Sequence, residues 1–285
     1  MKQGKIIVPP IKCQGIKTKL IPFIRATVQW NGKGRWIEPF LGSGVVAFNM
    51  APERALLTDK NEYIIRLYQG IQQGRITAET VRAFLELHGK KLAEQGNDYY
   101  LAMRTAFNEN HDPLYFLFLN RAGFNGLIRF NSQGGYNVPF CHNSNRFSRS
   151  YITKICNQVQ AAADVMAGRD WHFAQSEWED TVKDAQAGDY LYLDPPYIGR
   201  NTTYVGEWPE EEAGRLARAA HETPASVCLS MWQKDEVKKN RHLYQYWEDF
   251  CWHEQPYFYF VGGPQTRRHA VVELLAVREH TARLA

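Results

Sequence analysis

The chain has 285 residues, of which 44% are hydrophobic and 13% aromatic, and it carries a formal net charge of +4. This length allows one large core, or one core with an inserted subdomain, and no apolar run reaches the roughly 18–20 residues of a membrane helix. The mild positive charge permits a nucleic-acid partner without requiring one. The five cysteines include no C-x-x-C pair, and no signal-peptide pattern opens the chain. We therefore expect a cytoplasmic protein without a disulfide framework or a metal site.

The first informative segment, residues 12–20, reads KCQGIKTKL and runs into an apolar helix pattern. Lysines at a junction between a loop and a helix can bind phosphate or carboxylate groups. A solvated basic turn is the alternative for this segment alone.

Residues 36–48, WIEPFLGSGVVAF, predict a strand, a tight Gly-x-Gly turn and a helix that begins apolar. A second predicted strand, residues 55–58, ends at Asp59. Nucleoside-binding α/β folds hold ribose hydroxyls with an acid at this position. Because no Gly-Lys-Ser/Thr follows the glycines, a nucleoside cofactor without a triphosphate fits better than an NTP.

Residues 61–120 are predicted to be helical and form the candidate second domain. Residues 127–140 then predict a β-hairpin, with residues 132–135 as its turn. The hairpin carries arginines, asparagines and aromatics, and cationic and polar residues continue to Arg149. A two-stranded ribbon can enter the major groove of DNA, where Arg binds guanine and Asn binds adenine. An ordinary surface hairpin is the alternative.

The rest of the chain alternates between predicted helices and strands. Glu177 and Trp178 follow a short strand, and an acid beside an aromatic can bind and stack on a purine. The last two strands, with a turn at residues 262–264, indicate an antiparallel edge to a mixed sheet. The predicted helices are residues 152–166 and 210–221, and the predicted strands are residues 171–173, 226–231, 247–250, 257–261 and 271–277.

Residues 190–197, YLYLDPPY, carry the chemistry. The apolar run predicts a buried strand, and Asp194 follows at its carboxyl end, where open α/β sheets bind ligands. The two prolines turn the chain out of the sheet and leave the Pro195 carbonyl as an acceptor. With the ring of Tyr197, these acceptors suit the exocyclic amino group of a planar base. A strand end with a proline turn is the alternative.

In combination, these motifs resemble the Dam-type, D12 class (alpha group) DNA adenine-N6 methyltransferases. The resemblance implies an α/β fold: a Rossmann-like class I methyltransferase domain that binds S-adenosylmethionine, formed by residues 1–62 and 150–285. Residues 63–149 would be an inserted helical target-recognition domain carrying the β-hairpin. Double-stranded DNA is the implied partner, bound by a monomer or by a dimer on DNA. Neither a metal nor a membrane is expected.

The resemblance also implies roles for individual residues. Phe124 stands where the family often has a tyrosine, whereas Cys13 and Ile16 depart from the usual opening Lys-Trp-Ala-Gly-Gly-Lys. The implied catalytic residues are Asp194, Pro195, Pro196 and Tyr197. The implied cofactor-binding residues are Cys13, Lys17, Glu38, Phe40, Gly42, Gly44, Asp59, Glu177, Trp178 and Asp194. The implied DNA-binding residues are Lys12, Asn120, Arg121, Phe124, Asn125, Leu127, Arg129, Asn131, Asn137, Pro139 and Arg146.

The implied reaction is methylation of N6 of an adenine that is flipped out of the duplex. Tyr197 would stack on the base, while Asp194 and the Pro195 carbonyl would accept hydrogen bonds from N6 during a direct displacement. The target is expected to be GATC-like, or degenerate as in prophage-borne relatives with relaxed specificity. Two alternatives stay open: methylation of cytosine N4, RNA or protein glutamine, and a catalytically inactive DNA-binding module.

Overall fold

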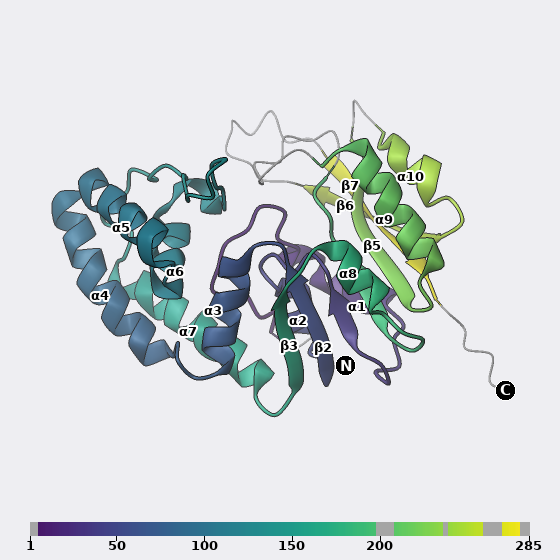
Figure 1. Ribbon diagram of the computed structural model, residues 1–285, viewed down its shortest axis with the longest axis horizontal. Helices are drawn as coiled ribbons and strands as arrows, with labels where there is room; N and C mark the ends of the chain where they lie inside the picture. The colour runs from purple at the N-terminus through teal and green to yellow at the C-terminus, as the bar shows by residue number, and fades with distance from the viewer. Residues whose placement is uncertain (1–4, 198–207, 236–238, 259–269, 280–285) are drawn as a thin grey trace.

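The computed structural model describes residues 5–197, 208–235, 239–258 and 270–279. A seven-stranded sheet has the order β3-β2-β1-β4-β5-β7-β6. The first five strands of this order pair in parallel, and β7 is antiparallel to both of its neighbours. The expected Rossmann-like class I methyltransferase fold is thus confirmed (Figure 1). The strands are β1 Trp36–Glu38, β2 Arg54–Asp59, β3 Asp170–Gln175, β4 Tyr190–Leu193, β5 Ser226–Lys234, β6 Cys251–Phe258 and β7 Ala270–Arg278.

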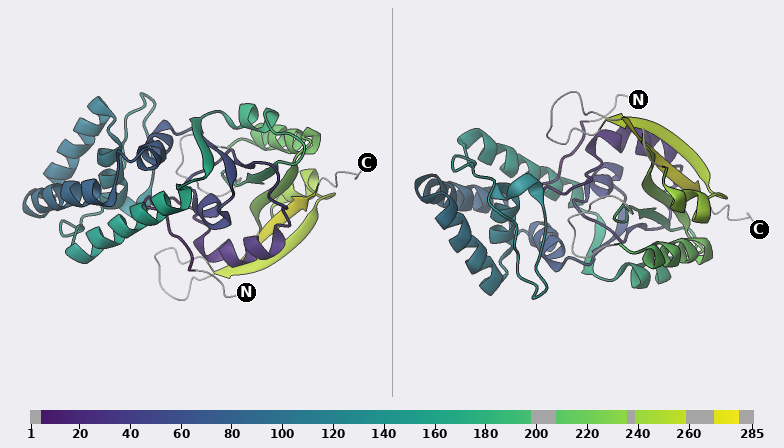
Figure 2. Two further views of the ribbon diagram at one scale, coloured as in Figure 1. Left: turned by 90° about the horizontal axis from the view of Figure 1, so that it is seen from below. Right: turned by 90° about the horizontal axis from the view of Figure 1, so that it is seen from above.

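Helices cover both faces of this sheet. Alternate strand residues point to opposite sides, so that Trp36 and Tyr190 join one core cluster while Ile37 and Leu191 join the other. Figure 2 shows the purple N-terminal helices and the green helices α8 and α9 on opposite sides of the sheet. The helices are α1 Ile21–Thr27, α2 Val45–Met50, α3 Glu62–Gln72, α4 Ala78–Gln95, α5 Asn97–Asn110, α6 Pro113–Ala122, α7 Arg149–Met166, α8 Trp178–Lys183, α9 Glu210–Glu222 and α10 Arg241–Tyr246, with 3-10 turns η1 Thr18–Leu20 and η2 Phe124–Gly126.

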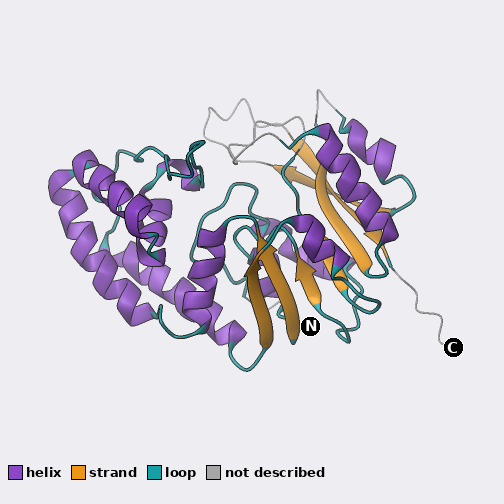
Figure 3. Cartoon of the chain, in the orientation of Figure 1, coloured by secondary structure: helices purple, strands orange, loops and turns teal. Residues whose placement is uncertain are grey.

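Helices α4 to α7 form a helical lobe beside the sheet (Figure 3). The segment 61–120, which the sequence predicts to be helical, contains the helices α3 to α6. Helix α3, however, packs on the sheet: the side-chain amides of Gln69 and Gln72 donate to the carbonyls of Phe173 and Trp171, at 2.8 and 2.7 Å. Because these bonds fasten α3 to β3, the helical lobe begins after α3.

The expected hairpin has two extended arms rather than a continuous ladder. The arms are joined by isolated bridges, including one between Phe130 and Tyr136, and by a bond from the Asn137 amide to the Arg129 carbonyl. The side chain of Asn108, on α5, bonds to both the amide and the carbonyl of Tyr136. These bonds tie the hairpin to the helical lobe.

One predicted strand is wrong and another begins earlier than expected. Residues 247–250 form a turn after α10, in which the Trp247 amide donates to the Leu243 carbonyl and the Phe250 amide to the Trp247 carbonyl. The strand predicted at residues 257–261 begins earlier, because β6 starts at Cys251. It pairs with β7 in antiparallel register, as expected for the closing pair. Residues 259–261 of the predicted last pair and the turn at 262–264 lie outside the described residues.

Candidate active site

A cavity of about 1380 Å³ lies at the carboxyl edge of the sheet, next to the helical lobe. Its wall combines segments that are far apart in the sequence: the loop before α1, the ends of β1, β2 and β4, the hairpin, and the starts of α8 and α9. Of the residues predicted for catalysis and cofactor binding, the wall contains Cys13, Lys17, Glu38, Phe40, Gly42, Asp59, Glu177, Trp178, Asp194, Pro195, Pro196 and Tyr197.

The turn between β1 and α2 is bound directly to the end of β2. Gly42 and Gly44 have φ angles of +51° and +71°, which other residues rarely adopt. One carboxylate oxygen of Asp59 accepts from the Gly42 amide and the other from the Asn61 amide, each at 2.8 Å. Burial raises the pKa of Asp59 to about 6. Asp59 thus fixes the glycine turn, and it also forms part of the cavity wall.

Lys17 joins the N-terminal loop to Asp194 in an ion pair. Its ammonium donates to the two carboxylate oxygens at 2.7 and 2.8 Å and to the Gly15 carbonyl at 2.9 Å. Lys17 is only 3% exposed, and the Asp194 side chain is 22% exposed, so water reaches the pair only from the Asp194 side. Burial raises the pKa of Asp194, although the neighbouring Lys17 ammonium opposes this shift.

Tyr197 is held at both ends of its ring. The backbone fixes one end, and the phenol hydroxyl donates to Glu273 Oε2, on β7, at 2.8 Å. The Lys17 ammonium lies over the ring, 5.0 Å from its centroid. The sequence analysis missed Glu273, although an acid within the apolar run AVVELLAV of β7 was a signal that could have found it.

Glu38 is a second buried carboxyl group in the wall, with 2% of its surface exposed. It accepts a hydrogen bond from the Trp36 indole nitrogen at 2.7 Å. Burial raises its pKa to about 8, and the charge of Asp194 adds to this shift. The Glu38 carboxyl is therefore mainly protonated at neutral pH.

Aromatic side chains form the wall at the start of α8. Phe40 stacks on Trp178 with ring centroids 6.5 Å apart, and Trp208 meets Phe40 edge-on at 5.6 Å. The Trp178 indole nitrogen donates to Glu212 Oε2 at 3.2 Å. Glu177, by contrast, is exposed and pairs with Lys60. Trp208 and Glu212 were not among the residues predicted from the sequence. An aromatic residue shortly before the acidic start of α9 was a signal that could have indicated them.

The residues predicted to contact DNA divide into exposed and buried groups. Phe124 is 48% exposed, and its neighbour Asn125 is exposed with a φ of +51°. Asn120, by contrast, is fully buried and brackets the backbone of Lys12: its side chain accepts from the Lys12 amide and donates to the Lys12 carbonyl. Asn120 therefore positions Lys12 rather than presenting donors to solvent.

Arg121 and Arg146 also bond inside the protein. Arg121 is 3% exposed and donates to the Pro10 carbonyl and to Gln158. Arg146 donates to the Arg121 carbonyl and to the Tyr151 hydroxyl. With its guanidinium directed inward, Arg121 offers no donor at the surface in this structure.

Within the hairpin, most of the predicted residues also have internal partners. The Arg129 guanidinium donates to the side chain and the carbonyl of Asn137, at 2.8 and 2.9 Å. The Asn131 side chain accepts from two amides of the turn, and Leu127 is buried. Pro139 is exposed. Arg129 is thus oriented in advance, but two of its donors are already in use.

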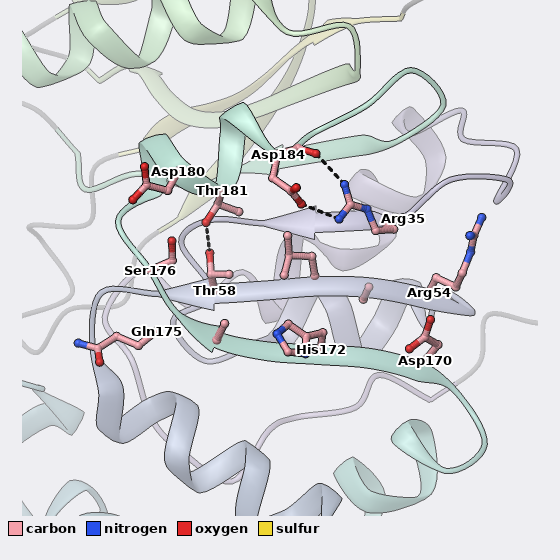
Figure 4. Close-up of a pocket in the computed structure, with 13 residues that line it drawn as sticks. Arg35, Arg54, Thr58, Asp170, His172, Gln175, Ser176, Asp180, Thr181 and Asp184 are labelled. Atoms are coloured by element: carbon pink, nitrogen blue, oxygen red, sulfur yellow. Dashed lines mark hydrogen bonds and ion pairs between the residues drawn. The ribbon is translucent and has the colours of Figure 1, made fainter.

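A second, smaller cavity of about 410 Å³ lies on the sheet face over β2 and β3 (Figure 4). Its polar groups bond to one another: Arg35 pairs with Asp184, and Thr58 with Thr181. None of the residues predicted for catalysis, cofactor or DNA contributes to its wall. The larger cavity is therefore the candidate active site.

Within the described residues, no group of three or more His, Cys, Asp and Glu side chains is arranged to hold a metal ion. No helix in these ranges is long and apolar enough to cross a membrane.

The sequence of this chain matches a known protein family and several of its members. A family model described as D12 class N6 adenine-specific DNA methyltransferase matches residues 14–259. A DNA adenine methylase of Vibrio cholerae is 33% identical over 223 residues, covering 73% of this chain and 75% of that protein. A DNA adenine methylase of Serratia marcescens is 29% identical over 257 residues, covering 85% and 88%.

Two further proteins are similar to this chain at lower sequence identity. A type II methyltransferase of Lactococcus lactis is 27% identical over 214 residues, covering 71% of this chain and 70% of that protein. Among solved structures, an rRNA methyltransferase from Streptomyces viridochromogenes covers 88% of this chain and 80% of its own, with 11% identity and a TM-score of 0.35. A likeness this low carries no argument about function.

Proposed function

The chain belongs to the D12 class of N6 adenine-specific DNA methyltransferases, and we propose that its large cavity binds S-adenosylmethionine together with a flipped adenine. Its reaction is the methylation of adenine N6 in DNA. One observation carries the proposal: Lys17, Asp59, Asp194 and Tyr197 line a single cavity although they come from three separate segments of the chain.

The residues of the cavity fit the cofactor. Phe40 and Trp178 offer a stacked apolar surface for an adenine ring. The Asp59 carboxylate can accept bonds from ribose hydroxyls, and the positive charge of Lys17 at the cavity wall favours the carboxylate of the methionine part. When bound, S-adenosylmethionine supplies an electrophilic methyl group on sulfur.

The target base is recognised by the residues at the end of β4. Tyr197 provides the ring on which the flipped adenine stacks. Asp194 and the Pro195 carbonyl accept hydrogen bonds from N6 and stabilise the positive charge that develops there. Lys17 fixes the direction of the Asp194 carboxylate through its two short bonds.

The helical lobe and the hairpin provide the DNA surface. Phe124 is the exposed ring available to enter the base stack, and Lys12 reaches the DNA from a backbone held by Asn120. Arg129 reads a base pair with the donors that Asn137 leaves available. We place the recognition domain within residues 63–149, with α3 remaining part of the catalytic layer.

The finer properties are part of the same proposal. The target is GATC-like or degenerate, the protein acts as a monomer or as a dimer on DNA, and it works in the cytoplasm, where its substrate lies. The match to adenine-specific methyltransferases supports adenine N6 rather than another planar amine.

A transfer assay tests the proposal. The purified protein is incubated with methyl-labelled S-adenosylmethionine and unmethylated plasmid, and the digested nucleosides are separated. We expect label in N6-methyladenine, with Asp194→Ala as the inactive control. Label in N4-methylcytosine, or label in RNA but not in DNA, would contradict it.

A further inference from the structure

The strongest unassigned feature of the molecule is the contact between Tyr197 and Glu273. Glu273 lies in the middle of β7 and is 1% exposed. Its strand partners are Trp232 on β5 and Gln255 on β6, so it is embedded in the sheet. Burying a carboxylate is costly unless hydrogen bonds compensate. The Tyr197 hydroxyl supplies one such bond, at 2.8 Å.

This bond restricts the ring of Tyr197. A tyrosine ring turns about two side-chain torsions, and fixing its far end while the backbone holds the near end leaves little freedom in either. The two prolines before Tyr197 restrict the backbone at the near end. The Lys17 ammonium lies 5.0 Å from the ring centroid, so one face of the ring is turned toward this cation.

We propose that Glu273 is a positioning residue for methyl transfer: it holds the Tyr197 ring so that the face turned away from Lys17 stacks on the target adenine. The inference rests on the proposed function, in which Tyr197 stacks on the base. Glu273 touches neither base nor cofactor in this account and acts only through Tyr197.

The orientation of the ring matters because transfer depends on geometry. Nitrogen, methyl carbon and sulfur must be aligned, and small misplacements of the reacting group cost large factors in rate. A ring that can rotate offers the base several stacking positions, of which only one is productive. Loss of the anchor should therefore slow the chemical step without weakening cofactor binding.

A double-mutant cycle tests this chain of contacts. Tyr197→Phe removes the donor and keeps the ring, Glu273→Leu removes the acceptor, and Glu273→Gln keeps an acceptor oxygen. Single-turnover methylation is measured at saturating DNA and S-adenosylmethionine, and cofactor Kd is measured by calorimetry. Glu254→Leu is the matched control, because Glu254 lies on the adjacent strand β6 and bonds to Gln233 instead.

We expect Tyr197→Phe and Glu273→Leu each to slow single-turnover transfer about tenfold, a typical effect of losing a hydrogen bond to a charged group. Cofactor Kd should stay within about twofold. Adding Glu273→Leu to Tyr197→Phe should cause no further loss, and Glu273→Gln should keep most of the rate. A purely structural role for Glu273 would instead slow both backgrounds equally.

Several results would overturn the inference. These are a full rate in Tyr197→Phe, equal losses for Glu273→Leu with and without the Tyr197 hydroxyl, or a Glu254→Leu effect as large as that of Glu273→Leu. If Glu273→Leu does not fold, Tyr197→Phe carries the test, because it removes the same hydrogen bond from the other side. A wild-type protein that labels adenine while all variants match it refutes this inference alone. A wild-type protein that labels no adenine refutes the proposed function, and the inference with it.

Discussion

Substitution of Asp59 is the most direct test of how the cavity binds its proposed cofactor. Each of its carboxylate oxygens accepts one backbone amide, from Gly42 and from Asn61. The remaining lone pairs can accept from the ribose hydroxyls. A hydrogen bond to a charged group is worth about 1.5–3 kcal/mol, so Asp59→Ala should weaken cofactor binding by about 10- to 100-fold.

The same geometry predicts that asparagine is a poor replacement. An amide has one acceptor oxygen, and its nitrogen would face either the Gly42 or the Asn61 amide, donor against donor. Asp59→Asn should therefore bind the cofactor almost as weakly as Asp59→Ala and should also unfold at a lower temperature than the wild type.

Protonation offers an independent check on Asp59. Because burial raises its pKa to about 6, the carboxylate is increasingly protonated below that pH and loses acceptor strength. Cofactor affinity of the wild type should fall as pH drops from about 7 to 5. In Asp59→Asn the part of this fall that belongs to Asp59 should disappear.

Calorimetry with S-adenosylmethionine and fluorescence anisotropy with duplex DNA are the two assays. Glu53→Ala is the control, because Glu53 is an exposed acid directly before the other end of β2. DNA affinity should be unchanged in both variants. A folded Asp59→Ala protein that binds the cofactor within about twofold of wild type would refute the assignment, as would an equal loss of DNA affinity.

Substitutions of Asp194, Glu38 and Arg129 give three further predictions. Asp194→Ala should reduce transfer at least 10²-fold, because it removes the acceptor aimed at N6; more than a tenth of wild-type activity in the labelling assay would reject that role. Glu38 should make thermal stability fall as pH rises from about 4.5 to about 8, since the carboxyl ionises near 4.5 in the unfolded chain and only near 8 in the folded protein; the melting temperature of Glu38→Gln should lack this fall, and an unchanged slope would contradict it. Arg129→Ala should flatten any sequence preference in plasmid-wide maps of N6-methyladenine, because an Arg–guanine contact is worth about 1–3 kcal/mol; strict methylation of an unchanged site would exclude this contact.

Some of the site could be derived from short stretches of sequence. The Asp194 position follows from a buried apolar run ended by two prolines, and the Asp59 position from a second strand after a glycine turn. In both cases the informative residues are within a few positions of one another, so local rules of strand, turn and helix suffice. The structure places both acids in the same cavity, as these patterns indicate.

Other predictions from sequence failed or were incomplete where a distant partner decides the outcome. Residues 247–250 have strand-like composition, yet they follow α10 as a turn. The hairpin arms are joined by an isolated bridge rather than a continuous ladder, and Asn108, on another element, binds the amide and carbonyl of Tyr136. Asn120 is a polar residue in an apparent recognition segment, yet its partner is the backbone of Lys12, 108 residues away.

The sequence by itself determined the class of fold, the strands that carry the acids and the chemistry of residues 194–197. Only the tertiary structure decided which charged side chains contact residues 194–197. Lys17 and Asp194 are 177 positions apart, and Tyr197 reaches Glu273 across 76 positions. The contact between Tyr197 and Glu273 depends on the order β4-β5-β7 in the sheet, which places the last strand one strand away from β4. No local pattern encodes that order, because it results from how all strands and helices pack together.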